Sequence, residues 1–210
     1  MKCHLLLSLF LILSAKTLFA DKISFEQNKK FVLDGTTLIY NDDLPNISEE
    51  DFITIDDVDI FKHYFENYNV KTLRLTSGGG QDFAGHQIRD LVQKYEIDTE
   101  ARGECSSACS FIFLAGKKRS LIGDASLGFH NRYTKVENQN ERIKKVEKFD
   151  ERLDYENTIA HFTRLNVVNE IVFYQVQGID MFFILKMLKV HPADMWYPKR
   201  DELKKYGVIN

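Results

Sequence analysis

The segment GECSSACSFIFLAG (Gly103–Gly116) places three serines and two cysteines at the start of an apolar run. The preceding residues, IDTEAR (Ile97–Arg102), are predicted to form a short strand, and SACSFIFLAG (Ser107–Gly116) a short apolar helix. A side chain at this junction would lie in the first helical turn, where unpaired backbone N–H groups and the positive helix end favour negative charge. The junction therefore predicts an anion site beside a potential nucleophile.

Strands and helices are predicted to alternate on both sides of this junction. Strands are expected within Phe31–Tyr40 (broken at Asp34–Gly35), over Val70–Thr76 and over Ala125–His130, and amphipathic helices over Asp56–Tyr68 and Phe83–Tyr95. Glycines 78–80 end the strand at Val70–Thr76. This βαβ alternation is typical of an α/β domain with a largely parallel sheet flanked by helices.

The chain becomes highly charged from Asn138 to Leu165. Apolar residues three and four apart predict one long amphipathic helix that projects from the sheet or covers it: Ile143, Val146, Phe149, Leu153 and Ala160. A second helical stretch is predicted over Val167–Val190, broken at Gly178. The charged face is interpreted as solvated, with partner binding as the alternative.

Residues 1–20 have the layout of a secretory signal, with a basic start at Lys2 and an apolar core from Leu5 to Leu13. This core is shorter than the ~20 residues that a membrane span needs, although an uncleaved anchor is the alternative. We expect a mature chain from Asp21, exported to a periplasm or outside the cell, with no stable membrane span.

The composition is that of one folded domain, predicted over residues 21–210. The chain has 210 residues, of which 44% are hydrophobic, so it can form one sizeable core but hardly two. The formal net charge of −3 provides no basic field, which argues against nucleic acid as a partner.

Four blocks of the sequence resemble, in the same order, the ClpP/crotonase fold superfamily in its ClpP-like secreted serine-protease branch. They are LTSGGGQDFAG (Leu75–Gly85), the spacing Gly103-x-x-x-Ser107, ASLGFH (Ala125–His130) and DMWYPKRDELKKYGVIN (Asp194–Asn210). The resemblance covers about Leu73 to Asn210. It implies a ClpP-like α/β fold, a peptide or protein substrate, no cofactor, and self-association as a homo-oligomer.

The resemblance also implies roles for individual residues. Ser107 would be the nucleophile, and His130, which lies 23 residues later, would be its base. The backbone N–H groups of Gly80 and Ala108 would form the oxyanion hole. Asp194 would complete a Ser-His-Asp triad; Asp180 is the alternative, and a dyad remains open.

Each of these residues also has an ordinary structural interpretation. Ser107 could be a helix N-cap, with Ser106 as a competing nucleophile, and His130 could be a strand-end residue without a catalytic role. Glycines 78–80 could form a plain turn, although Gly78 stands where the family pattern has proline. A phosphate loop is not indicated, because the G-x-x-x-x-G-K-[ST] pattern is absent.

Cys105 and Cys109 would be the cysteines of the mature chain, since Cys3 would leave with the signal. Residues four apart on a helix have Cα atoms ~6 Å apart, which a disulfide can bridge. An oxidising compartment also favours a bridge. We predict this disulfide over a thiol nucleophile, a metal site or two buried thiols.

The resulting functional prediction is an exported serine hydrolase, most simply a peptidase. The alternative is a non-catalytic ClpP-like scaffold that acts by oligomer or partner binding. The crotonase branch catalyses acyl-CoA chemistry, but a serine and a histidine in this order favour hydrolysis.

Overall fold

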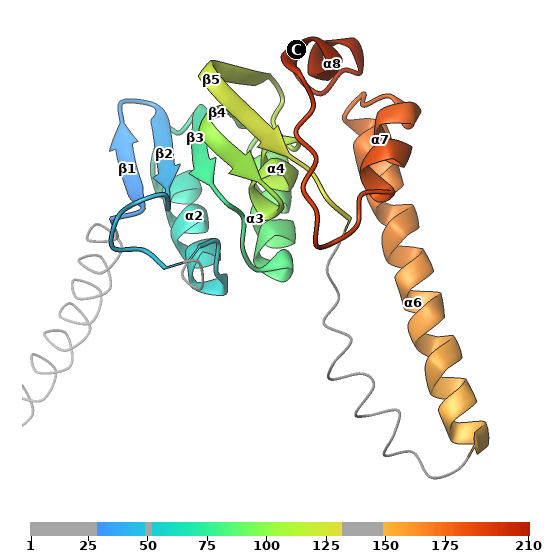
Figure 1. Ribbon diagram of the computed structural model, residues 1–210. Helices are drawn as coiled ribbons and strands as arrows, with labels where there is room; N and C mark the ends of the chain where they lie inside the picture. Colours follow the sequence, from blue (N-terminus) through green and yellow to red (C-terminus); the bar gives the residue numbers. More distant parts are fainter. Residues whose placement is uncertain (1–28, 49–51, 132–148) are drawn as a thin grey trace, which may run out of the picture.

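The computed structural model describes residues 29–48, 52–131 and 149–210. The predicted signal and residues 138–148 of the charged segment lie outside these ranges. The elements are β1 Phe31–Asp34, β2 Thr37–Asn41, α2 Ile55–Asn67, β3 Thr72–Ser77, α3 Asp82–Lys94, β4 Asp98–Ser106, α4 Ala108–Phe113, β5 Arg119–Gly128, α6 Phe149–Val176, α7 Met181–Leu188 and α8 Arg200–Lys205 (Figure 1).

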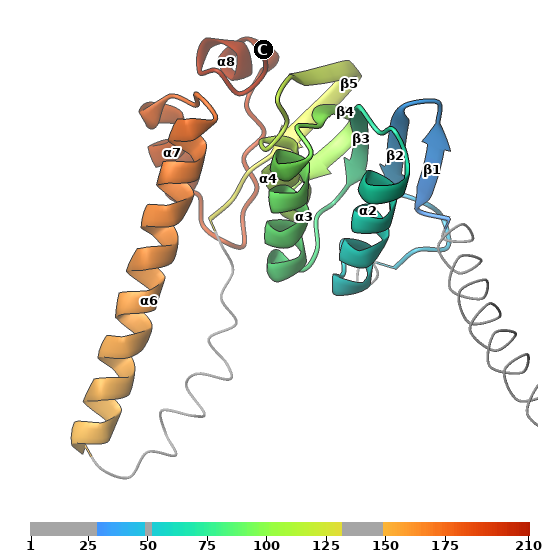
Figure 2. The same ribbon diagram turned by 180° about the vertical axis from the view of Figure 1, so that it is seen from behind.

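The five strands form one sheet in the order β1-β2-β3-β4-β5. β1 and β2 are an antiparallel hairpin, whereas β2, β3, β4 and β5 are parallel neighbours. Helices α2, α3 and α4 make the crossovers and lie together on one face of the sheet (Figures 1 and 2). Sequential strand order with crossovers of one hand requires this arrangement. The α/β class predicted from the alternation is therefore confirmed.

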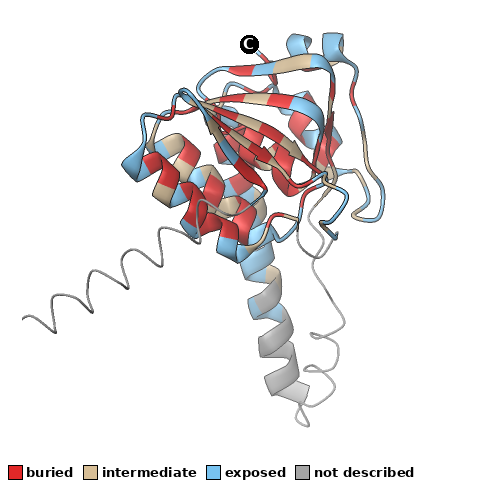
Figure 3. Cartoon of the chain, turned by 90° about the vertical axis from the view of Figure 1, so that its left-hand side faces the viewer, coloured by how far each residue is buried: buried red, intermediate tan, exposed pale blue. Residues whose placement is uncertain are grey.

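The core lies between the sheet and these helices. Along β3, Leu73 and Leu75 are fully buried, and the alternating residues Thr72, Arg74 and Thr76 are half-buried, as expected for a strand covered on one face. The buried positions of α2 and α3 follow helical spacing, so each helix turns one apolar face to the sheet (Figure 3). The core thereby fixes the ends of β3, β4 and β5 relative to one another.

The predicted break between two helices near residue 166 is wrong, because α6 runs without interruption from Phe149 to Val176. Helix α6 ends at Val176, close to Gly178, where the sequence predicts a break. Gly178 has a φ of 76°, and its N–H donates to the carbonyl of Gln175. This left-handed residue satisfies carbonyls of the last turn and turns the chain into α7.

Arg119, the first residue of β5, holds the C-terminal segment and the end of α6 against this strand through hydrogen bonds. This buried guanidinium donates to the carbonyl oxygens of Gln177, Gly207 and Val208 at 2.8–2.9 Å. A cation held by several carbonyls makes strong, directional contacts. Helices α6 and α7 are consequently held next to β5, the strand that His130 follows.

An apolar stripe remains exposed on α6. Its residues recur at helical spacing: Phe162, Leu165, Val168, Val172 and Val176. The stripe expected from the sequence lay earlier in the chain, largely on residues whose side chains the structure does not describe. Within the described ranges, no helix combines the length and apolar character that crossing a membrane requires.

Candidate active site

Ser107 joins the end of β4 to the start of α4 in a conformation that serine rarely adopts. Its φ and ψ are 55° and −122°, and among the described residues only Glu96 is a second non-glycine residue with positive φ. Ser107 occupies the N-cap position of α4, yet its side chain makes no capping hydrogen bond. The structure therefore places Ser107 at the N-cap position but leaves its hydroxyl unused as a cap. Backbone strain of this kind clusters at functional sites.

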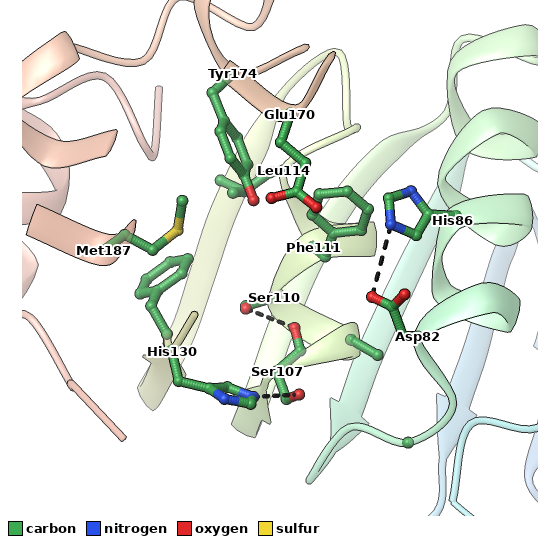
Figure 4. A pocket seen from close by; sticks show the side chains of 13 residues that line it. Asp82, His86, Ser107, Ser110, Phe111, Leu114, His130, Glu170, Tyr174 and Met187 are labelled. Atoms are coloured by element: carbon green, nitrogen blue, oxygen red, sulfur yellow. Dashed lines mark hydrogen bonds and ion pairs between the residues drawn. The ribbon is translucent and has the colours of Figure 1, made fainter. Parts of the chain in front are cut away.

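The hydroxyl of Ser107 instead meets the side chain of His130, which follows β5. The distance from Ser107 Oγ to His130 Nε2 is 2.7 Å (Figure 4). The competing Ser106 is buried and donates from its Oγ to Glu104 at 2.6 Å. Of these two serines, Ser107 is the one that contacts His130, whereas Ser106 is buried against a carboxylate.

The N–H of Gly80 is directed away from the neighbouring Ile53. The carbonyl oxygen of Gly79 accepts from the Ile53 N–H at 2.9 Å, and the described residues contain no cis peptide bond. The N–H of Gly80 shares that trans peptide plane, so it points opposite to the Gly79 carbonyl. Gly80 also lines the same pocket as Ser107.

The second predicted donor, Ala108, is the first residue of α4 and follows Ser107 directly. Its N–H belongs to the first helical turn, where no intrahelical acceptor exists. Gly80 and Ala108 both line the pocket that contains Ser107 and His130. The structure thus brings together four of the predicted site residues.

The glycine turn is packed too tightly against its neighbours for a side chain. A Cβ atom on Gly80, whose φ is 141°, would lie 2.3 Å from the carbonyl oxygen of Ile53. A Cβ on Gly79 would lie 2.7 Å from the Cβ of Ser107. Glycine is required here because the backbone approaches both an adjacent segment and the serine.

A buried polar network supports this turn from beneath. Ser77 donates from its Oγ to Asp42 Oδ2 at 2.6 Å and accepts from the Gly79 N–H at 3.0 Å. Tyr40 donates to the same carboxylate oxygen at 3.0 Å. Asp42 is fully buried, and its Oδ1 has no partner within the part of the chain that the structure describes.

Burial raises the pKa of Asp42 from its ordinary 3.8 to about 6. The hydrogen bonds from Ser77 and Tyr40 oppose this rise, as does the positive charge of Lys30. Desolvation of the charged carboxylate is nevertheless the largest effect. Folding therefore favours the protonated form of this group.

Stability should consequently fall as pH rises from about 4 to about 6. In this window the folded protein still holds the Asp42 proton, which the unfolded chain has released. Above about pH 6, the free energy of unfolding should be about 3 kcal/mol lower than at acidic pH where both states are protonated. Urea unfolding of wild type and Asp42→Asn across this range should show that the substitution removes this slope. The exposed neighbour Asp43 offers a matched control, Asp43→Asn, which should retain it; equal pH profiles for wild type and Asp42→Asn would contradict the account.

The predicted third member, Asp194, is not placed at the histidine. His130 Nδ1 lies 3.0 Å from the carbonyl oxygen of Pro192, while Asp194 is exposed. The alternative, Asp180, caps α7 by accepting from the Phe182 N–H at 2.7 Å. The backbone pairing of Phe129 with Trp196 explains this arrangement, because it aligns the strand end with the segment containing Pro192.

Asp194→Asn should therefore leave hydrolysis within about twofold of wild type, since substitutions of exposed groups away from the reacting atoms rarely matter. The measurement is kcat/KM for an activated ester substrate. A loss of about 10⁴-fold, as when a triad carboxylate is neutralised, would restore Asp194 to the mechanism.

The disulfide prediction is confirmed. Cys105 at the end of β4 and Cys109 in α4 are bonded, with Cα atoms 5.2 Å apart and both side chains buried. The bridge spans Ser106, Ser107 and Ala108, so it links the strand and the helix on either side of the strained serine. This link restrains the turn that presents the hydroxyl.

A pocket of about 250 Å³ opens beside Ser107 and His130. Figure 4 shows side chains from several elements around it. Its lining is Gly80, Asp82, His86, Ser107, Ala108, Ser110, Phe111, Leu114, Phe129, His130, Glu170, Tyr174 and Met187. Sequence reasoning missed the contributions of α6 and α7; the available signal was Glu170, a single acid within the apolar stretch VVNEIVFY (Val167–Tyr174).

Comparison with known proteins gives a likeness of fold. No protein-family profile matches the chain, and no curated protein matches it. Among solved structures, the chain is similar to a ClpP1 variant from Listeria monocytogenes, with 18% identity and a TM-score of 0.47. The match covers 74% of this chain and 81% of that one. At this level the likeness concerns the fold alone.

Proposed function

We propose that this protein is a serine hydrolase that cleaves peptide or protein substrates, with Ser107 as nucleophile and His130 as base. One observation carries the proposal: the strained Ser107 leaves its capping role unfilled and places its Oγ 2.7 Å from His130 Nε2. A serine that merely capped a helix would use its hydroxyl on the backbone of the first turn. Here the hydroxyl is held for proton transfer instead.

The contact at Nδ1 selects the useful tautomer of His130. The Pro192 carbonyl only accepts hydrogen bonds, so Nδ1 carries the proton that it receives at 3.0 Å. The Nε2 lone pair is then available to the Ser107 hydroxyl. The carbonyl thus performs the orienting task that a carboxylate performs in a triad, but it adds no negative charge.

The reaction would proceed in two steps, acylation of Ser107 and hydrolysis of the acyl-enzyme. As Ser107 Oγ bonds to the substrate carbonyl carbon, its proton moves to Nε2, and the N–H groups of Gly80 and Ala108 stabilise the oxyanion. His130 then gives this proton to the departing amine as the carbon–nitrogen bond breaks. Water attacks the acyl-enzyme, again through His130, which releases the acid and restores Ser107.

Export and self-association complete the proposal. A disulfide between two buried cysteines suits an oxidising compartment such as a periplasm or the extracellular space. The exposed apolar stripe on α6 supports a homo-oligomer, because a stripe of this kind is normally covered by a partner. A scaffold that binds partners without catalysis is the second candidate, and this same stripe favours it.

A pre-steady-state experiment distinguishes the two candidates. Mixed with a p-nitrophenyl ester, a serine hydrolase that forms an acyl-enzyme should release a burst of nitrophenol, up to one equivalent per chain, before steady turnover. A non-catalytic scaffold should release it no faster than buffer. Absence of release above the buffer rate from folded protein would therefore refute the hydrolase proposal.

A further inference from the structure

The pocket extends from the candidate nucleophile along one face of α4. Ser107, Ser110, Phe111 and Leu114 all line it, and their spacing of three, four and seven residues places them on the same side of the helix. A substrate side chain entering this pocket would therefore begin at Ser107 and run along α4. The residues at the far end decide which side chain fits.

Glu170 of α6 supplies the carboxylate at that end. Its side chain and that of Tyr174, one helical turn later, both line the pocket. Figure 4 shows the carboxylate of Glu170 on the side away from Ser107 and His130, beside the Tyr174 hydroxyl and the ring of Phe111. Glu170 is only 8% exposed, which is uncommon for glutamate.

The walls between these two ends are largely apolar. They are formed by Phe111 of α4, Leu114 directly after α4, Phe129 after β5, and Met187 of α7. From Ser107 to the far end, the pocket thus presents polar catalytic groups, then apolar walls, and finally a carboxylate. A long aliphatic stem that ends in a cation matches this order, because lysine and arginine bury their methylenes on apolar surface and present the charge beyond them.

The other charged groups around the pocket do not make its lining positively charged. Asp82 of α3 is a second acid on the lining and is paired with His86 at 3.6 Å. Arg89 does not line the pocket; its guanidinium lies over the rings of Phe111 and Phe173 and pairs with Asp90. The described lining therefore holds two carboxylates, and its only basic side chains are His86 and His130.

We infer that the pocket selects a substrate with lysine or arginine at the position that supplies the attacked carbonyl, and that Glu170 is the specificity-determining residue. This inference rests on the proposed hydrolase function. It requires only that the carboxylate line the pocket. A carboxylate offers about four acceptor positions, so it can bind an incoming cation while it serves a neighbouring donor.

The test uses a matched pair of peptidyl phosphonate esters that carry lysine or norleucine at the position next to phosphorus. The two side chains share their stem and differ in the terminal ammonium. A simple alkyl fluorophosphonate, which has no such side chain, serves as the reference probe. The measured quantity is the rate of Ser107 modification by each reagent in the full protein.

Wild type should react about 10- to 100-fold faster with the lysine reagent than with the norleucine reagent, as expected for a charge-assisted contact. Glu170→Gln should bring this ratio close to one, because the lysine reagent loses its charge-assisted contact. Glu66→Gln, which removes a carboxylate from α2 outside the pocket, should preserve the ratio.

The outcomes separate the two proposals. If the fluorophosphonate fails to modify Ser107 in folded wild-type protein, the hydrolase function is refuted. If it modifies Ser107 but the lysine reagent has no advantage, including the case in which neither peptidyl reagent reacts, the specificity inference is overturned. An advantage that survives in Glu170→Gln also overturns it.

Discussion

Replacing Ser107 with alanine should reduce hydrolysis to the rate of buffer alone. The hydroxyl is the group that would form the covalent bond, and loss of the nucleophile in a serine protease costs about 10⁶-fold in kcat. His130→Ala should have an effect of similar size, because an unassisted serine hydroxyl is a weak nucleophile near neutral pH. Steady-state hydrolysis of an activated ester, with circular dichroism to verify folding, provides the measurement.

The fold should survive Ser107→Ala. The side chain makes no capping hydrogen bond, so its removal costs α4 no cap. Ser106→Ala is the matched control, since Ser106 is the adjacent serine and its hydroxyl contacts Glu104 rather than His130. That variant should keep catalytic activity. Full activity in Ser107→Ala, or its loss in a folded Ser106→Ala, would show that the nucleophile is assigned to the wrong residue.

Gly80→Ala should reduce hydrolysis by about 10²- to 10³-fold, the usual cost of losing one oxyanion donor. The added Cβ would lie 2.3 Å from the oxygen and 2.6 Å from the nitrogen of Ile53, both of them backbone atoms. The turn must therefore shift, and the N–H of Gly80 shifts with it. The measurement is kcat/KM at a temperature well below the melting midpoint of the variant.

Gly123→Ala separates this collision from backbone strain. Gly123 also has positive φ, at 58°, but a Cβ there would meet nothing within 4 Å. This control should lose about 1 kcal/mol of stability because a non-glycine residue is strained at positive φ. It should retain wild-type activity. Equal activity in folded Gly80→Ala would remove Gly80 from the oxyanion hole.

The parts of the site that the sequence predicts are those held by short-range geometry. Cys105 and Cys109 are four residues apart across the junction of β4 and α4, and a connection this short keeps their Cα atoms within the range that a disulfide can bridge. Ser107 lies at a strand-to-helix junction that can be identified from composition. The glycine run and His130 each follow a strand, and parallel strands bring their carboxyl ends to one edge of the sheet. These residues meet as expected.

The remaining parts of the site and fold depend on contacts that no particular residue type indicates. A backbone carbonyl at Pro192 orients His130, and any residue could provide that oxygen, whereas a triad pattern in the sequence points to aspartates such as Asp194 and Asp180. The continuity of α6 was missed because charged and apolar stretches were interpreted as separate helices. Glu170 and Met187 reach the pocket from α6 and α7, and the placement of these helices depends on long-range contacts such as those of Arg119 with Gln177 and Val208.

The central claim is that Ser107 is a nucleophile, and covalent labelling tests it most directly. The full protein is treated with an alkyl fluorophosphonate, its intact mass is measured, and the modified peptide is sequenced by tandem mass spectrometry. We expect one adduct per chain, located on Ser107, and none on Ser107→Ala. Folded wild-type protein that stays unlabelled, or that carries its label on another residue such as Ser106 or Ser110, would contradict the account.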